Sequence, residues 1–302
     1  MWTVNLIRTP RWASQFAVSS PRQLGLRRLT TTVSHSTQDL PKETTGELPQ
    51  TQTQTQTPTP PRQPTRFWKR VTLEPTTESG GGWTVNLDQR AIRTPAGQRL
   101  VLGPHQRTLG LLLVGEWDSQ DRVLKPHALP LTSLVARSID GLHTSEQRQK
   151  VVDQLMRYLQ TDAICNQQTF PQALVDLQTQ YWTSVIEWAQ NHYGVTIHTT
   201  DQLFGMSQSA ETERVLRSHV ETFSPLQLAA FERVVLHTKS FLLGLALIQR
   251  KISVEDAAQA AQVEVLAQIK QWGYVEDTHD VNEEDMRRML GAVACTLLTS
   301  KS

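Results

Sequence analysis

The sequence predicts an α+β protein in which a small antiparallel β-sheet comes first and a larger set of helices follows. Two observations lead to this. Short β-prone runs, separated by turn signals, lie between residues 66 and 102. From residue 144 onward, apolar residues recur at helical spacing almost to the end of the chain. Strands followed by a run of helices are typical of segregated α+β architectures.

The chain is expected to begin with two segments outside the globular part. Residues 1–38 contain five arginines and no Asp or Glu, which is the composition of a mitochondrial transit peptide; a basic tail without a targeting role is the alternative. Residues 39–65 end in a Thr/Gln/Pro-rich repeat and should form a disordered linker. Residues 39–302 hold 25 basic and 29 acidic residues, so we expect no nucleic-acid partner.

Cysteine usage and hydropathy limit the compartment. Cys165 and Cys295 lie far apart and belong to no metal-ligand motif, so we expect free thiols in a reducing environment. The longest apolar run, residues 241–248, is much shorter than the ~20 residues that a membrane span needs. We therefore expect no stable membrane insertion, and we expect a monomer.

Residues 66–130 are predicted to form a β-rich domain with one helix. Trp83, Val85 and Leu87 alternate with polar residues, which predicts a strand with one buried face. The glycines before Trp83 precede a strand and not a helix, so a hairpin turn is favoured over a phosphate loop. The helix should begin at Pro104 and end near Gln120.

Residues 131–302 are predicted to form a helical domain. A break in the helical pattern is expected at residues 161–165. The expected helices cover residues 131–141, 145–159, 171–194, 210–223, 225–250 and 253–272, with a last one starting near Asn282.

The stretch from Ser253 to Asp280 is predicted to hold one long helix. Ser253 is suited to cap its start, with Asp256 close to a capping box, and Gly273 is suited to end it. An apolar stripe should run along one face to Trp272. Glu264 lies at the edge of this stripe beside alanines too small to cover it, so its carboxylate either is solvated or faces a partner.

No specific catalytic motif is present. The strongest candidate for a metal site is Glu276, Asp277, His279 and Asp280, although their spacing matches no ligand motif and acids there also suit the start of the next helix. A metal-dependent matrix enzyme and a small-molecule-binding module therefore stand as alternatives. Tryptophans beside acids, at residues 116–118 and 187–188, suit a protein-binding surface, while each Trp alone is well explained as a core residue.

Several segments together resemble the mitochondrial F1-ATPase assembly factor 2 chaperones. These are EWDSQ at 116–120, LQTDAIC at 159–165, VIEWAQNHYGV at 185–195, and the frame of Glu264, Gln268, Trp272 and Gly273. The resemblance covers residues 66–298. The chain departs from it at residues 183–184, where the family often has Asp-Pro, and at 265–266, where further acids are common.

This resemblance implies a non-enzymatic chaperone of the mitochondrial matrix. Such a protein binds the F1-ATPase alpha subunit, prevents its aggregation and yields to the beta subunit, with no cofactor and no metal. By the resemblance, Glu264, Gln268 and Trp272 are partner-binding residues, with Trp272 also placing its helix. The residues assigned to a structural motif are Glu116, Trp117, Asp118, Trp188 and Gly273.

Overall fold

The computed structural model describes residues 64–77, 81–202, 205 and 207–298. The predicted transit peptide and nearly all of the predicted linker lie outside the described residues. Those residues all belong to one compact unit of the chain.

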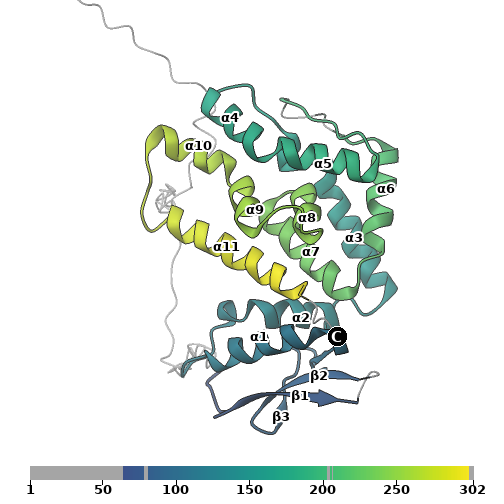
Figure 1. The fold of residues 1–302 in the computed structure, drawn as a ribbon, viewed down its shortest axis with the longest axis vertical. Coiled ribbons are helices and arrows are strands. Elements are labelled where there is room, and N and C mark those ends of the chain that lie inside the picture. The colour runs from purple at the N-terminus through teal and green to yellow at the C-terminus, as the bar shows by residue number, and fades with distance from the viewer. Residues whose placement is uncertain (1–63, 78–80, 203–204, 206, 299–302) are drawn as a thin grey trace, which may run out of the picture. The chain divides into compact units, whose positions relative to one another are not determined.

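A small antiparallel sheet opens the described part, as predicted (Figure 1). Its strands are β1 (Val71–Thr76), β2 (Gly82–Leu87), β3 (Arg90–Ala91) and β4 (Val101–Leu102). β2 is central, because it pairs with each of the other three. Gly82 begins this strand where a Cβ atom would lie 2.0 Å from the Leu102 carbonyl oxygen, so the close approach of β4 requires glycine.

The prediction that β2 buries a single face is wrong. Val85 and Leu87 are buried, but so are Thr84 and Asn86 on the opposite face. The helix α1 (Arg107–Asp118), which follows a 3-10 turn at Pro104–Gln106, contacts β1 and β2. The chain between β3 and β4 then brings the Leu100 carbonyl oxygen within 3.3 Å of the Thr84 hydroxyl, so polar residues of the strand are enclosed too.

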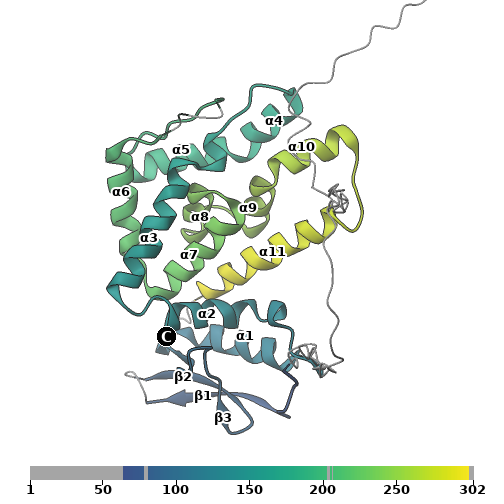
Figure 2. The same cartoon turned by 180° about the vertical axis from the view of Figure 1, so that it is seen from behind.

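Helices and the loops that join them form the rest of the described chain (Figures 1 and 2). Two further 3-10 turns lie at Pro126–Ala128 and Ala163–Cys165. The helix α8 (Phe241–Ile248) lies in the middle of the helical part, and all its residues are buried. The helices are α2 (Pro130–Asp140), α3 (Ser145–Gln160), α4 (Gln172–Tyr181), α5 (Thr183–Tyr193), α6 (Ala210–Glu221), α7 (Pro225–Thr238), α8 (Phe241–Ile248), α9 (Val254–Ala261), α10 (Val263–Trp272) and α11 (His279–Thr296).

Three helices predicted as continuous are each two helices. The breaks lie at Trp182, at Lys239 and Ser240, and at Gln262. Lys239 has a left-handed backbone with φ of 57°, and the Ser240 hydroxyl then accepts a hydrogen bond from Leu243 N–H to cap α8. Trp182 is buried between α4 and α5 and donates from Nε1 to the Ala260 carbonyl oxygen at 2.8 Å. Apolar periodicity continues through these breaks, so it does not reveal them.

The expected break at residues 161–165 contains a buried carboxylate that joins two parts of the helical core. Asp162 Oδ1 accepts a hydrogen bond from Ile164 N–H at 3.1 Å, and Oδ2 accepts one from Leu242 N–H at 2.9 Å. The second bond reaches the first turn of α8, where a negative charge is favoured by the helix dipole. Burial raises the pKa of Asp162 to about 6, against the opposing effect of these hydrogen bonds.

The last three helices place the candidate site. α9 contacts α4, α8 and α11, and α10 packs against α4. A loop then returns the chain to α11, which contacts α9, α7 and α2 (Figures 1 and 2). α11 starts at His279, three residues before the predicted position. Among the described residues, no helix combines the length and the apolar character needed to cross a membrane.

Candidate partner-binding site

The structure places the three predicted partner-binding residues on one exposed stripe. Glu264, Gln268 and Trp272 are four residues apart on α10, so they lie above one another along the helix. All three are exposed, and the Trp272 side chain keeps 60% of its surface accessible. An indole with this exposure beside a carboxylate and an amide has the character of an interaction surface.

The buried side of α10 differs from the predicted one. Val265, Ile269 and Trp272 were expected on the apolar stripe, but the first two are only half-buried and Trp272 is exposed, while Val263 and Ala267 are buried instead. The break at Gln262 explains the change, because a new helix begins there with its own orientation against α4. The predicted apolar stripe assumed one uninterrupted helix, and its second half was therefore wrong.

The segment from Trp272 to Val281, here called the hairpin tip, comprises the end of α10, the loop after it and the first residues of α11, and it continues the exposed apolar surface. Tyr274, Val275 and Val281 keep 49%, 55% and 59% of their surface accessible. His279 organises the loop: its Nδ1 accepts a hydrogen bond from Val275 N–H at 3.0 Å, and its ring lies edge-on to Tyr274 at 5.3 Å. Several large apolar residues gathered on a built loop are unusual for a surface without a partner.

Two residues assigned to the structural motif have local roles in helices: Gly273 ends α10, and Trp188 packs on the surface of α5. Gly273 ends α10 with φ of 92°, and its N–H donates to the Ile269 carbonyl oxygen at 2.9 Å. Its ψ of 167° differs from that of the predicted left-handed stop. Trp188 on α5 is half-buried and stacks on His192 with the ring centroids 5.3 Å apart.

The acidic residues around the tip do not come together in this structure as a group that could hold a metal ion. Glu276 and Asp277 are exposed, and His279 Nδ1 already accepts the bond from Val275. Within the part of the chain that the structure describes, no group of three or more His, Cys, Asp or Glu side chains could hold a metal ion. This part of the chain is instead strongly acidic. Residues 253–298 contain nine acidic and three basic residues, which gives a net charge of about −6.

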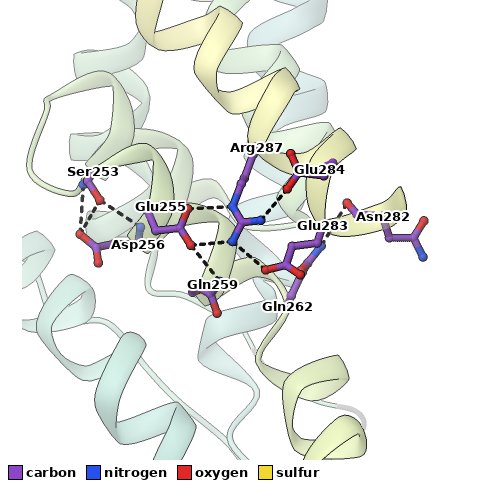
Figure 3. Close-up of polar contacts among 9 residues, drawn as sticks. All are labelled: Ser253, Glu255, Asp256, Gln259, Gln262, Asn282, Glu283, Glu284 and Arg287. Carbon is purple, nitrogen blue, oxygen red and sulfur yellow. Dashed lines mark hydrogen bonds and ion pairs between the residues drawn. The ribbon is translucent and has the colours of Figure 1, made fainter. Parts of the chain in front are cut away.

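The guanidinium group of Arg287 links α11 to α9, next to the exposed stripe on α10 (Figure 3). Arg287 on α11 binds Glu255 on α9 through two hydrogen bonds of 2.8 and 2.9 Å, and it also contacts Glu283 and Glu284 on its own helix. Because Arg287 donates to it, the pKa of Glu255 falls to about 2. Sequence reasoning missed Arg287: its pairs within α11 have helical spacing, but Glu255 lies 32 residues away.

The start of α9 and the break after it are fixed in the same region (Figure 3). Ser253 and Asp256 form the capping box that the sequence indicated. Gln262 donates from Nε2 to the Asn282 carbonyl oxygen at 3.3 Å, which attaches the break between α9 and α10 to α11. This contact with α11 therefore helps to fix the direction in which α10 leaves α9, and so the position of the exposed stripe.

The Glu116, Trp117 and Asp118 motif lies at the junction of α1 and α2. The Glu116 carboxylate accepts hydrogen bonds from the N–H groups of Leu131 and Thr132, at 2.7 and 2.9 Å, and so caps α2 from a neighbouring helix. Burial raises the pKa of Glu116, and these bonds oppose the rise. Trp117 donates from Nε1 to Thr132 Oγ1 at 2.8 Å.

The other contacts of this motif reach the first described residues. The Trp117 ring lies 5.2 Å from the Trp68 ring. Asp118 pairs with Arg66, with 3.2 Å between Oδ1 and Nη2, and the Asp118 carbonyl oxygen accepts from Arg66 Nη1 at 2.8 Å. Glu116 and Trp117 thus join α1 to α2, and Trp117 and Asp118 join α1 to the segment that precedes β1.

Comparison with known proteins gives one consistent family. Residues 65–190 match the sequence model of a family described as ATP12 chaperone protein. Over 268 residues the chain is 31% identical to Protein ATP12, mitochondrial, of Saccharomyces cerevisiae, covering 76% of this chain and 82% of the yeast protein. Protein atp12, mitochondrial, of Schizosaccharomyces pombe is 30% identical, with coverages of 76% and 80%. The crystal structure of Atp12 from Paracoccus denitrificans matches with a TM-score of 0.67 and 27% identity, over 77% of this chain and 97% of that one.

Proposed function

We propose, because this chain belongs to the ATP12 chaperone family, that it binds the unassembled α subunit of the mitochondrial F1-ATPase and prevents its aggregation until the β subunit replaces it. The family makes the chain a chaperone of ATP synthase assembly, and the names of its relatives make it mitochondrial. Within the mitochondrion, we propose the matrix as the compartment and the α subunit as the client. The exposed stripe of Glu264, Gln268 and Trp272 is the observation that carries it.

The physical task of such a chaperone is to cover a surface that the assembled complex will bury. An unassembled subunit exposes apolar area and strand edges, which promote aggregation. A chaperone interface of standard size, roughly 1,200–2,000 Å², covers part of that area and can still be displaced by a larger native interface. The stripe and the hairpin tip supply exposed apolar side chains for such an interface.

Glu264 is proposed as the polar contact of this interface. Its carboxylate is exposed, and no hydrogen bond or ion pair occupies it among the described residues. It lies in an acidic region, so a basic surface on the client would be attracted and oriented by it. Gln268 and Trp272 extend the same side of α10 and would bury the adjoining client surface.

The test follows aggregation of purified α subunit by light scattering during dilution from denaturant. Native chain should suppress the scattering, and Glu264→Lys should lose much of that effect while its circular dichroism and melting temperature stay near native. Glu221→Lys, the same change at an exposed position of α6, should remain active. Full activity of Glu264→Lys would remove Glu264 from the interface, and no suppression by the native chain would remove the α subunit as client.

Trp272→Ala gives a second measure of the same surface. Because 60% of the indole surface is accessible, truncation should change stability little, yet it should weaken α-subunit binding by about tenfold or more if the indole is an anchor. Affinity is measured by fluorescence anisotropy with labelled α subunit, and stability by urea unfolding. Lost stability with unchanged affinity would assign Trp272 to helix placement instead.

A catalytic role is not part of this proposal, since the family is one of chaperones. The metal-dependent alternative can be tested directly by titrating Mg²⁺, Mn²⁺ or Zn²⁺ into the native chain in a calorimeter. Saturable heat that disappears in Asp277→Asn would favour it, and a flat titration would end it.

A further inference from the structure

A second surface of the chain has the opposite charge from the α10–α11 region. The structure contains a pocket of about 610 Å³ beside the sheet, here called the arginine-rimmed pocket. Its volume lies within the ~300–1,000 Å³ range of ligand-binding clefts. Among the residues that line it are Phe67, Trp68, Arg90, Arg93, Arg99 and Trp117.

The pocket has a rigid apolar floor. Trp68, Leu87 and Ile92 are buried, and Trp117 is held by its hydrogen bond to Thr132. The two tryptophan rings lie 5.2 Å apart. The Trp68 Nε1 atom is also buried and has no acceptor among the described residues, so a ligand oxygen that reached it would satisfy an unpaired donor.

The rim combines an exposed aromatic ring with positive charge. Phe67 keeps 66% of its surface accessible. Arg90, Arg93 and Arg99 are all exposed, and in the described part of the chain no carboxylate pairs with Arg90 or Arg93. Arg93 donates instead to the Gly97 carbonyl oxygen at 2.8 Å, which orients it but leaves its charge uncompensated. Residues 64–104 as a whole contain six basic and three acidic residues.

We propose that the arginine-rimmed pocket binds a client segment in which a large apolar side chain is flanked by carboxylates. The apolar side chain would occupy the tryptophan-lined floor, and the carboxylates would meet the guanidinium groups of Arg90 and Arg93 at the rim. A concave site suits a peptide side chain better than the flat surface of a membrane. As a client-binding site this inference rests on the proposed chaperone function, but it concerns a surface other than the exposed stripe.

Two contact surfaces of opposite charge would serve a chaperone in a specific way. An acidic stripe and a basic pocket attract different parts of one client, so each contact can be modest while the two together hold the client firmly. A client bound in the wrong orientation would place like charges together, which disfavours it. Release can then proceed one contact at a time as a native partner competes.

The binding test uses fluorescein-labelled peptides and the full-length chain. One peptide alternates glutamate with leucine and phenylalanine, a second replaces every glutamate by lysine, and a third replaces the leucines and phenylalanines by alanine. Fluorescence anisotropy should show saturable binding of the first peptide only, weakening as salt is added. Equal binding of the lysine peptide would overturn the proposal, as would equal binding of the alanine peptide.

Variants locate the binding within the molecule. Arg90→Glu with Arg93→Glu should weaken binding of the acidic peptide by about tenfold or more, because two attractions become repulsions. Arg157→Glu, an exposed charge reversal on α3 outside the pocket, should leave it unchanged. If the double variant does not fold, as judged by circular dichroism, Phe67→Ala at the exposed rim tests the same site. Unchanged affinity in the folded variant overturns the proposal.

Two further outcomes separate this proposal from its rivals. Vesicles containing an anionic phospholipid, added to the complex, should not displace the acidic peptide; displacement together with tight vesicle binding would assign the pocket to a lipid surface instead. The aggregation assay distinguishes the two inferences. Failure of the native chain to protect α subunit contradicts the proposed function, whereas intact protection without peptide binding contradicts the pocket alone.

Discussion

Arg287 on α11 holds Glu255 on α9 with two parallel hydrogen bonds, of 2.8 Å between Nε and Oε2 and 2.9 Å between Nη2 and Oε1 (Figure 3). This two-point geometry fixes the relative orientation of the two helices more firmly than one contact would. Because α10 begins directly after α9, the Arg287–Glu255 pair also influences the position of the exposed stripe. The contribution of this pair to the free energy of unfolding should depend on pH.

Glu255→Gln should lower stability at neutral pH and have a vanishing effect in acid. The pKa of Glu255 is about 2 in the folded chain and about 4.5 as the unperturbed reference, so the folded state favours the ionised form. The stabilisation is therefore fully present above about pH 4.5 and is lost as pH falls toward 2. Urea unfolding of both proteins between pH 7 and pH 3 measures the difference.

The matched control for this experiment is Glu276→Gln, which removes the same charge from an exposed position at the hairpin tip. It should change the unfolding midpoint little at any pH. A gap between native and Glu255→Gln that stays constant from pH 7 to pH 3 would show that the pair does not act through the ionised carboxylate. The effect should be modest, since the Glu255 side chain keeps 55% of its surface accessible.

Asp162→Asn should destabilise the helical core. The amide presents an NH₂ group where one carboxylate oxygen now accepts a backbone N–H, so either Ile164 or Leu242 loses its acceptor. A buried donor left unpaired costs about 1–3 kcal/mol. Guanidinium unfolding at pH 6 measures the loss, and Asp121→Asn, at an exposed loop position, is the control.

The same substitution should also remove a pH dependence. Because burial raises the folded pKa of Asp162 to about 6 from 3.8, its contribution to stability is complete below about pH 4 and is lost as pH rises through 6. The deficit of Asp162→Asn relative to the native chain should thus be larger at pH 5 than at pH 8. A deficit that grows with pH would contradict this linkage.

What could be read from the sequence, and what could not, follows from the range of the interactions. The capping box of Ser253 and Asp256 and the β2 strand depend on neighbouring residues, and both were predicted. At the break, by contrast, Gln262 contacts the Asn282 carbonyl oxygen, twenty residues away. A pattern of apolar residues carries no record of such a contact, so one helix was expected where there are two.

The candidate site shows the same division. Glu264, Gln268 and Trp272 share a four-residue spacing, and that spacing alone places them on one side of any helix. Whether that side is exposed depends on how α10 meets α4, which only the fold determines. The arginine-rimmed pocket was missed altogether, because Phe67, Arg93 and Trp117 come from separate segments with no shared periodicity.

Trp117→Arg should reduce the soluble yield of the protein strongly. The change removes the hydrogen bond to Thr132 and the ring packed on Trp68, and it places a second guanidinium near Arg66, which already lies 5.5 Å from the Trp68 ring. We expect a loss of about 2–4 kcal/mol in the free energy of unfolding. Trp117→Phe keeps a ring and should lose only ~1 kcal/mol with the hydrogen bond. Urea unfolding ranks the three proteins, and equal stability of both variants would contradict the assignment.

Gly244→Ala should destabilise the chain although alanine is the better helix former. Gly244 lies in the buried helix α8, where an added Cβ would come within 2.7 Å of Phe231 Cε2 and 2.8 Å of Val235 Cγ2, two fully buried side chains of α7. Overpacking of this kind costs about 1–3 kcal/mol and exceeds the ~1 kcal/mol gained in helix propensity. Gly291→Ala is the matched control in α11, since no heavy atom lies within 4 Å of its added Cβ. That variant should gain up to about 1 kcal/mol. Thermal unfolding should therefore show a lower melting temperature for Gly244→Ala and a higher one for Gly291→Ala. A higher melting temperature for both would show that α7 and α8 move apart easily to admit the added methyl group.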